Sequence, residues 1–395
     1  MNATAPGATA DVVIIGGGCV GTSVAFQLAR RQAGKIILLE RHTVGSGPTS
    51  KTSGFIRLHY SHDPLILLAA RSLEMFAEFE RLTGGTADFT RCGFLLLAAG
   101  EAFVTARVTV EAQQALGVRA SILTAGEVST LDPRMAVDDI DGAAYEPDAG
   151  YADGYATTAS FAGAARRLGV EIWEETPVER ITADDGGVRG VVTTRGSIET
   201  RTVLVAGGPW SPALLAPLGV DLPIRVTRHQ VVHLSPPPGF GPVPFLCVDS
   251  GQGFYFRPET GGTVFLGMVD DQPEEIVPPD GFNSGVDFDF IERVGRCWRR
   301  RYPDASEAQV KGGFASVYDV TPDWQPVLGP VAEVPGLHLA AGFSGHGFKL
   351  SPALGEVLAD TITGRHPSID ISAFNLGRFT TGRLIRGRHA QSILG

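Results

Sequence analysis

Short apolar runs that end in glycine-rich turns are the most regular pattern along this chain. From Asp11 the sequence reads DVVIIGGGCVGTSVAFQLARRQAGKIILLE, where two apolar runs flank a segment with helical spacing. The run TVLVA that starts at Thr202 and the run LHLA that starts at Leu337 are also followed by glycines. Short apolar runs bounded by glycine are typical of buried strands, and a strand followed by a helix and a second strand indicates a parallel sheet. The pattern therefore predicts an α/β unit near the start of the chain.

The segments between the last two of these runs have a different pattern. RVTRHQVVHLS, from Arg225, is predicted to be a strand, and GFYFRPETGGTVFLGMVD, from Gly253, a hairpin that turns at Gly261 and Gly262. Two proline-rich segments, SPPPGFGPVP and QPEEIVPPDG, are predicted to be loops. The basic run GRFTTGRLIRGRH near the C-terminus is expected to be a solvated tail or a packing arm.

Composition narrows the class of protein. The chain has 395 residues, 43% of them hydrophobic and 19% charged, as expected of a globular protein with about two or three domains. A net charge of -10 argues against nucleic-acid binding. The four cysteines lack metal-ligand or dithiol spacing, so we expect no metal site and reduced thiols. A membrane helix needs about 20 consecutive apolar residues, and no apolar run of the chain approaches that length. The start MNATAPGATA does not resemble a signal peptide. We expect a soluble, cytoplasmic protein that binds neither nucleic acid nor membrane.

A glycine motif at the end of the first apolar run indicates a dinucleotide site. Gly16, Gly18 and Gly21 form GxGxxG between a strand pattern and a helix pattern, and Glu40 follows 19 residues after the last glycine. The glycines permit a tight turn, close approach to a pyrophosphate and close packing of helix on strand, while the helix N-terminus offers free N–H groups. Glu40 can accept hydrogen bonds from ribose hydroxyls. The unit alone leaves FAD and NAD open, but the sequence has no second GxGxxG, which favours electrons taken from a small substrate.

Five motifs in order along the chain carry a family likeness. They are the GxGxxG unit, GSGPTSKTSGFIRLHY, VLVAGGPW, YDVTPDWQPVLGP and GFSGHGFKLSP. Together they resemble the D-amino-acid oxidase superfamily of flavoproteins. Within it they are most similar to the sarcosine oxidase group, both the monomeric enzymes and the flavin subunit of the heterotetrameric ones.

This resemblance implies the fold. It predicts an α/β FAD-binding domain of the Rossmann type, built from discontinuous segments, and an α+β substrate domain with a mainly antiparallel sheet. We assign residues 1–90, 151–222 and 322–395 to the FAD-binding domain. Residues 91–150 and 223–321 are assigned to the substrate domain, which would cover the flavin.

The resemblance also implies a substrate clamp. Arg57 in GFIRLHY and Lys349 in GFSGHGFKLSP match the family's two cations that hold the substrate carboxylate. Burying a carboxylate is costly unless it is paired, so two converging cations imply an anionic amino-acid substrate. Tyr255 and Tyr318 are candidates for the pocket, with core packing as the alternative for each. Three histidines are expected to be structural rather than catalytic bases: His59, His62 and His346.

The residues expected to hold the cofactor come from several of these motifs. The glycines of GFSGHG would let the backbone run against the flavin ring. The helix after them would point its N-terminus at the flavin, where its dipole is worth about 0.3 to 2 kcal/mol. Cys19 is expected to fit its turn as a small residue rather than to react. The full set is Gly16, Gly18, Cys19, Val20, Gly21, Glu40, Arg41, Ser50, Thr52, Ser53, Val178, Ala206, Gly207, Trp210, Gly342, Ser344, Gly345, His346, Gly347, Phe348 and Lys349.

Two positions depart from the family pattern. Ser316 stands where monomeric sarcosine oxidases carry the cysteine that is bonded to the flavin, so we expect FAD to be held non-covalently. Phe265 stands where relatives that react fast with oxygen carry a lysine, whose charge stabilises oxygen as it is reduced. We therefore expect slow use of oxygen and a preference for a dye, a quinone-like acceptor or a protein acceptor.

The sequence thus predicts an FAD-dependent enzyme that oxidises the C–N bond of a secondary or N-methyl, sarcosine-like amino acid to an imine that hydrolyses. Its partners would be the amino acid and oxygen or another electron acceptor. One alternative is the same reaction on a D-amino acid or glycine, and another is oxidation of a 2-hydroxy acid. A third is a flavin-binding subunit that is inactive without partner subunits.

Overall fold

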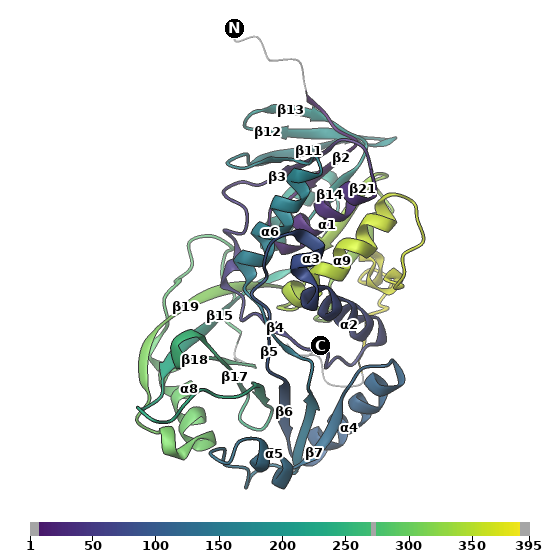
Figure 1. Cartoon of the computed structure of the whole chain (residues 1–395). Helices are drawn as coiled ribbons and strands as arrows, with labels where there is room; N and C mark the ends of the chain where they lie inside the picture. Colours follow the sequence, from purple (N-terminus) through teal and green to yellow (C-terminus); the bar gives the residue numbers. More distant parts are fainter. Residues whose placement is uncertain (1–7, 270–273, 388–395) are drawn as a thin grey trace.

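The computed structural model describes residues 8–269 and 274–387. Three segments lie outside this range: residues 1–7, 270–273 and 388–395. They include the end of the predicted hairpin, the start of the second proline-rich loop and the last residues of the basic run. Within it the chain forms two β-rich parts, one above the other in Figure 1. Segments from both ends of the chain meet in the upper part.

A six-stranded sheet forms the centre of the upper part (Figure 1). Neighbouring strands are parallel except for the last pair, in which β20 runs antiparallel to β21. The apolar runs predicted as strands are β2, β3, β14 and β21, and they are apolar throughout because both faces of the sheet are covered. In sheet order the strands are β10 (Glu171–Trp173), β3 (Ile36–Leu39), β2 (Val12–Ile15), β14 (Val203–Val205), β21 (Leu337–Ala341) and β20 (Val327–Pro330).

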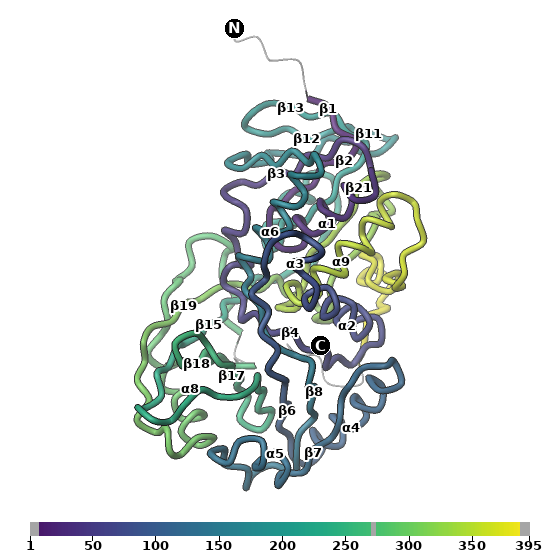
Figure 2. The backbone as a smooth tube through the Cα atoms, viewed as in Figure 1, coloured from purple at the N-terminus to yellow at the C-terminus, as the bar shows by residue number. Residues whose placement is uncertain are grey.

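Helices cover one face of this sheet, and a smaller sheet covers the other. Helix α1 (Cys19–Arg30) is buried almost all round, because α6 (Gly154–Arg167) and α9 (Gly347–Ile362) flank it, while α2 (Asp63–Ala77) packs on α9. The tube in Figure 2 shows the purple N-terminal segment and the yellow C-terminal segment side by side here. The opposite face packs against α7 (Ser211–Leu215) and the sheet of β1 (Ala8–Thr9), β13 (Gly196–Glu199), β12 (Gly187–Thr193) and β11 (Val178–Asp184).

The lower part is built on an eight-stranded sheet (Figure 1). Its pairs are antiparallel except for β16 with β6. Strands β17 and β18 form the hairpin predicted around Gly261 and Gly262. In sheet order the strands are β19 (Gln309–Val320), β15 (Arg225–Ser235), β18 (Val264–Met268), β17 (Phe254–Pro258), β16 (Leu246–Asp249), β6 (Phe94–Ala98), β8 (Gly142–Glu146) and β7 (Ser121–Thr124).

The two faces of the eight-stranded sheet have different partners. One face packs against α8 (Phe288–Arg301) through Phe290, Val294 and Trp298. The opposite face carries Tyr255 and Phe265 and packs against Phe55, which lies in the small sheet of β4 (Phe55–Ile56), β9 (Gly150–Tyr151) and β5 (Thr90–Arg91). The second face is therefore turned toward the segment that continues from β4 to Arg57. The remaining helices of the described residues include α3 (Phe79–Thr83), α4 (Gly100–Ala115) and α5 (Ala125–Leu131).

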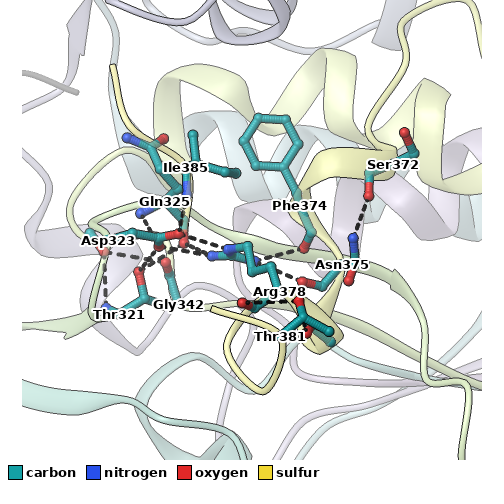
Figure 3. A network of polar contacts seen from close by, with 12 residues as sticks. Thr321, Asp323, Gln325, Gly342, Ser372, Phe374, Asn375, Arg378, Thr381 and Ile385 are labelled. Atoms are coloured by element: carbon teal, nitrogen blue, oxygen red, sulfur yellow. Dashed lines mark hydrogen bonds and ion pairs between the residues drawn. The ribbon is translucent and has the colours of Figure 1, made fainter. Parts of the chain in front are cut away.

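The C-terminal basic run is a packing arm up to residue 387 rather than a solvated tail. Arg378 is buried and donates through Nε and Nη2 to the carboxylate of Asp323 at 2.8 and 3.0 Å (Figure 3). The same guanidinium donates to the carbonyl groups of Gln325 and Phe374, and Asp323 also accepts from the N–H of Ile385. The arm thus fastens the turn of TPDW, which leads from β19 into β20.

Candidate active site

The GxGxxG turn lies at the carboxyl end of β2, where its glycines have no room for side chains. Gly16 has φ of 115°, and a Cβ there would lie 2.3 Å from the carbonyl oxygen of Ala206. A Cβ on Gly21 would lie 2.0 Å from the carbonyl oxygen of Gly16, so helix α1 packs directly on the turn. Helix α1 begins after Gly18 without a side-chain cap; its Cys19 N–H donates to the Thr49 hydroxyl at 3.4 Å, and the following N–H groups of the first turn remain for a ligand. This is the local structure that a bound pyrophosphate requires.

Glu40 follows β3 at the same edge of the sheet. Its carboxylate accepts hydrogen bonds from the N–H of Gly17 at 2.7 Å and from the N–H of His42 at 2.9 Å. These two bonds fix the side chain beside the glycine turn while its oxygens keep further acceptor capacity. The residue predicted to accept from a ribose therefore lies next to the glycine turn.

Arg41 and Trp210 form a contact that the sequence did not suggest. The Arg41 guanidinium stacks on the Trp210 ring at 3.8 Å from its centroid, and both side chains bind the carboxylate of Asp280. Asp280 belongs to the second proline-rich loop, so this loop reaches from the lower part to the edge of the dinucleotide turn. The three residues are exposed or partly exposed, and their contact therefore contributes little stability.

A second glycine turn joins β21 to α9 at the neighbouring position of the sheet edge. Gly342 has φ of 69°, and its N–H donates to the Asp319 carboxylate at 2.7 Å. Burial raises the pKa of Asp319 to about 6. Ser344 also has positive φ, and its Oγ accepts from the N–H of Thr321. The turn is thus held in shape by β19 and by the TPDW segment.

Helix α9 starts at the last glycine of GFSGHG, and this determines the surroundings of Lys349. The helix starts at Gly347 without a side-chain cap, so Lys349 lies in its first turn and not in the glycine turn. Pro352 lies inside the helix, where its missing N–H removes one backbone hydrogen bond. The Ser351 hydroxyl donates to the Phe348 carbonyl at 2.8 Å, the group that the missing N–H of Pro352 would have bonded. This replacement allows the helix to extend back to Gly347.

Lys349 and Arg57 form a pair of buried basic side chains. Lys349 is 8% exposed and Arg57 is 4% exposed. The Arg57 guanidinium lies over the Tyr60 ring at 4.8 Å from its centroid and donates to the carbonyl of His59. Burial, and then the charge of Arg57, hold the pKa of Lys349 well below its usual range. The two predicted halves of the clamp are therefore close enough to repel each other.

Buried titratable groups surround this pair. Glu146 is 1% exposed and accepts from the N–H of Leu58 at 2.8 Å and from the Gln113 amide at 2.6 Å. Burial raises the pKa of Glu146, and the charge of Arg57 lowers it in part. His346 lies at the N-cap of α9 with its Nδ1 3.3 Å from the Tyr60 hydroxyl. Burial, Lys349 and Arg57 hold the pKa of His346 well below its usual range, so its ring is neutral.

The eight-stranded sheet brings the other predicted pocket residues to one face, which we call the site face. The registers place Tyr255 opposite Gly267 and Phe265 opposite His233, so the two aromatic side chains point to the same side. A Cβ on Gly267 would lie 2.3 Å from the Tyr255 hydroxyl. Burial raises the pKa of Tyr318 to about 12, and a hydrogen bond with Tyr255 lowers it in part. The tyrosines are thus neighbours on this face.

Tyr318 connects the site face to the second glycine turn. A Cβ on Gly345 would lie 2.8 Å from the Tyr318 ring, so the ring packs directly on the turn. The opposite side of the ring stacks on His229 with 3.8 Å between centroids. Ser316 pairs with His229 in the register of β19 and β15 and is 7% exposed. Ser316 therefore lies on the site face two residues from Tyr318.

Sequence reasoning missed Arg257, His229 and Glu146. Arg257 lies 4.7 Å from the centroids of the Tyr151 and Phe265 rings, and its Nε donates to the Ser53 carbonyl at 2.6 Å. Its position two residues after Tyr255 in a strand could have revealed that both share a face. Nothing in the sequence pattern could have placed Glu146 beside Arg57, because that contact joins strands far apart in the chain.

The other predicted cofactor residues lie at the same edges or close to them. Cys19 is buried, burial raises the pKa of its thiol, and Thr49 donates to its sulfur at 3.6 Å, so it acts as a packing residue. Phe348 packs on Phe76. Val20 is buried in α1, Val178 starts β11, Ala206 and Gly207 follow β14, and Ser50, Thr52 and Ser53 lie in or just after the short 3-10 helix Pro48–Lys51.

Comparison with known proteins identifies the family. The family model described as FAD dependent oxidoreductase matches residues 11–361. 4-Methylaminobutanoate oxidase (formaldehyde-forming) of Paenarthrobacter nicotinovorans is 28% identical over 378 residues, which is 93% of this chain and 45% of that protein. Sarcosine oxidase subunit beta of Arthrobacter sp is 28% identical over 391 residues, 97% of this chain and 94% of that protein. The chain therefore spans less than half of the first relative and nearly all of the second.

Solved structures of similar fold support the same family. L-Proline dehydrogenase from P. horikoshii has a TM-score of 0.88 at 27% identity, over 96% of this chain and 100% of that one. Glycine oxidase from Geobacillus kaustophilus has a TM-score of 0.81 at 26% identity, over 94% of this chain and 99% of that one. No helix among the described residues has the length and apolar character needed to cross a membrane. Because the family model matches most of its length, the chain belongs to the FAD-dependent oxidoreductases of the D-amino-acid oxidase superfamily and is an enzyme.

Proposed function

We propose that this enzyme oxidises the C–N bond of a secondary or N-methyl amino acid to an imine, which then hydrolyses. The observation that carries the proposal is the buried pair Arg57 and Lys349. Two cations in a buried site cost free energy unless an anion joins them, and an amino acid brings a carboxylate with its amine on the next carbon. A simple amine would bring no anion to this pair.

The described residues fit FAD, and we propose that they hold it without a covalent bond. The crowded glycine turn at Gly16 and the fixed carboxylate of Glu40 suit its adenosine diphosphate part. The uncapped N-terminus of α9 suits the electron-rich edge of its ring. Ser316 offers a hydroxyl at the position where relatives have a thiol, and a hydroxyl does not form a thioether. When bound, FAD supplies the centre that accepts a hydride.

We propose that the two large sheets belong to two domains, one that binds FAD and one that binds the substrate. Residues 1–90, 151–222 and 322–395 would form the FAD-binding domain, and residues 91–150 and 223–321 the substrate domain. All strands of the six-stranded sheet lie in the first set and all strands of the eight-stranded sheet in the second. The site face would then form one wall of the substrate pocket opposite Arg57 and Lys349.

In this mechanism the protein binds, orients and excludes water. Arg57 and Lys349 hold the substrate carboxylate, which fixes the neighbouring carbon and its C–H bond in one orientation. Tyr255 and Tyr318 line the pocket with neutral hydroxyls, because burial keeps the pKa of Tyr318 at about 12. The aromatic site face keeps water away until the imine is formed. A catalytic base among the histidines is not required once the amine is neutral.

Relatives support this substrate class. The names of 4-methylaminobutanoate oxidase and L-proline dehydrogenase both refer to secondary amino acids. The likeness to glycine oxidase favours a primary amino acid as the runner-up. The likeness to sarcosine oxidase subunit beta supports a second alternative, a flavin subunit that needs partner chains.

Anaerobic reduction of the purified protein separates these functions. We expect its yellow colour to bleach with an N-methyl amino acid or proline, and more slowly with glycine, D-alanine or lactate. Faster bleaching with glycine or D-alanine would favour the runner-up, and faster bleaching with lactate a 2-hydroxy-acid dehydrogenase. A yellow protein that none of these compounds bleaches would contradict an autonomous enzyme and favour the subunit.

A further inference from the structure

The charge of Lys349 before substrate arrives is the feature that the proposed function does not explain. Lys349 is 8% exposed, and within residues 8–269 and 274–387 its amino group has no hydrogen bond or ion pair. Arg57 is the one charge that acts on it in this range, and it is a positive one. An arginine stays protonated in proteins, whereas a buried lysine readily loses its proton.

The other titratable groups around the pair do not neutralise Lys349. Glu146, from β8, is already bonded by the Leu58 N–H and the Gln113 amide, and its charge acts on Arg57. His346, on α9 itself, is kept neutral, and the burial of Tyr60 keeps its hydroxyl protonated. Tyr318, from the site face, is likewise a neutral hydroxyl. Among the described residues the one charge that acts on the lysine is therefore the positive charge of Arg57.

We propose that Lys349 is uncharged in the empty site and takes the proton of the substrate's ammonium group as the substrate carboxylate enters. This inference rests on the proposed amino-acid substrate. One N–H bond of the substrate breaks and one bond from Nζ to hydrogen forms, so the charge of the complex stays constant. The carboxylate then lies between two cations, and the substrate nitrogen carries the free electron pair that its oxidation needs.

The size of the effect makes such an acceptor useful. A secondary amine of pKa about 10 is neutral in only about one molecule in a thousand at pH 7. An enzyme that bound only the neutral form would lose that factor in apparent affinity. Transfer to Lys349 removes the loss, because the same carboxylate that the substrate brings makes the protonated lysine favourable.

Methoxyacetate is the probe that isolates this step. It has the shape and carboxylate of N-methylglycine, with an ether oxygen in place of the ammonium, so it cannot supply the proton. Added to the FAD-loaded protein in weakly buffered solution with a pH indicator, it should cause uptake of about one proton per bound molecule at pH 8. Its affinity should fall about tenfold per pH unit between pH 7 and 9.

Variants assign the proton to one residue. Lys349→Arg keeps a permanent charge, so it should bind methoxyacetate with no proton uptake and with an affinity independent of pH. Lys349→Met should bind more weakly, also without uptake. Lys311→Met, which changes an exposed lysine on β19, should behave as the wild type.

The outcomes are distinct. Binding of methoxyacetate to the wild type without proton uptake would overturn this inference and leave the proposed function intact. Uptake that persists in Lys349→Arg would overturn the assignment to Lys349. Failure of the FAD-loaded wild type to bind methoxyacetate or any other small carboxylate would instead contradict the proposed carboxylate site itself.

Discussion

Phe265 and Arg257 are neighbours on the site face, where the sequence predicts the contact with an electron acceptor. The guanidinium of Arg257 lies over the Phe265 ring, but it is already bonded to the Glu259 carboxylate and to the Ser53 carbonyl. Its charge is therefore partly compensated. A phenyl ring supplies no charge of its own, and the slow use of oxygen stays a prediction from the sequence.

We predict that Phe265→Lys speeds the reaction of the substrate-reduced protein with oxygen by about tenfold or more, which requires about 1.4 kcal/mol of charge stabilisation. The reaction is followed by stopped-flow mixing with aerated buffer. Phe265→Met, which has a similar length and no charge, is the control and should stay slow. Fast formation of stoichiometric peroxide by the wild type would make the enzyme an oxidase and contradict the prediction.

His338 gives a test of burial at a single residue. Burial lowers the pKa of this β21 side chain from 6.5 to about 4, and its Nδ1 has no hydrogen-bond partner among the described residues. As the pH falls from 6.5 to 4 the unfolded chain binds this proton before the folded chain does. Stability is therefore present above pH 6.5 and is lost toward pH 4, by at most about 3 kcal/mol.

We predict that His338→Leu reduces the loss of thermal stability between pH 6.5 and 4.5. The measured quantity is the difference in melting temperature between wild type and variant at each pH. This difference is needed because Asp319, with its pKa raised to about 6, shifts stability in the opposite direction over part of the range. A constant difference across the range would contradict the prediction.

A site residue could be predicted from the sequence where its contacts are with residues close to it along the chain. Gly16, Gly21 and Glu40 belong to one local unit, so their spacing alone identified them. Glu146 and Arg57 are neighbours only because strands from different segments come together, and no local pattern records that. Arg257 could have been predicted in part, because it stands two residues after Tyr255 in a predicted strand and so shares a face with it.

At the scale of elements, the C-terminal arm shows how one contact fastens a turn. The buried carboxylate of Asp323 has its charge partner in Arg378, 55 residues later (Figure 3). Burial alone would raise the pKa of this carboxyl, but the hydrogen bond and charge of Arg378 hold it below its usual value. The basic run had suggested either solvent or packing, and only the fold selects packing.

We predict that Arg378→Leu lowers the melting temperature by about 5 to 10 °C, because removing one partner of a buried ion pair costs about 3 to 5 kcal/mol. Arg383→Leu, an exposed arginine of the same arm, should change it little. The arm should also become sensitive to proteases in Arg378→Leu. Equal melting temperatures of the two variants would contradict the role given to this ion pair.

The elements themselves were predictable where the pattern is strong. The apolar runs and the hairpin at Gly261 are strands as expected, because burial on both faces or tight turns leave clear patterns. Pro352 inside α9 is an exception, because proline is normally found in the first turn of a helix. The Ser351 hydroxyl that compensates it is a local detail that propensities do not include.

At the scale of the whole molecule, whether FAD is bound covalently depends on one atom, the side-chain oxygen of Ser316. Ser316 lies on the site face, buried beside Tyr318. We predict that acid or heat denaturation releases all the FAD, so that the yellow colour stays in solution after the polypeptide is removed. Colour that remains on the denatured chain would contradict this and point to attachment at another residue.

The central claim is that Arg57 and Lys349 bind a substrate carboxylate, and removing the carboxylate from the substrate tests it most directly. The measurement compares the rate of anaerobic flavin reduction by N-methylglycine with that by dimethylamine, the same secondary amine without the carboxylate. Wild type and Lys311→Met should prefer N-methylglycine by about thirtyfold to several-thousandfold, equivalent to about 2 to 5 kcal/mol. In Arg57→Met and Lys349→Met, with FAD still bound, this preference should shrink at least tenfold. An unchanged preference in both variants would contradict the account.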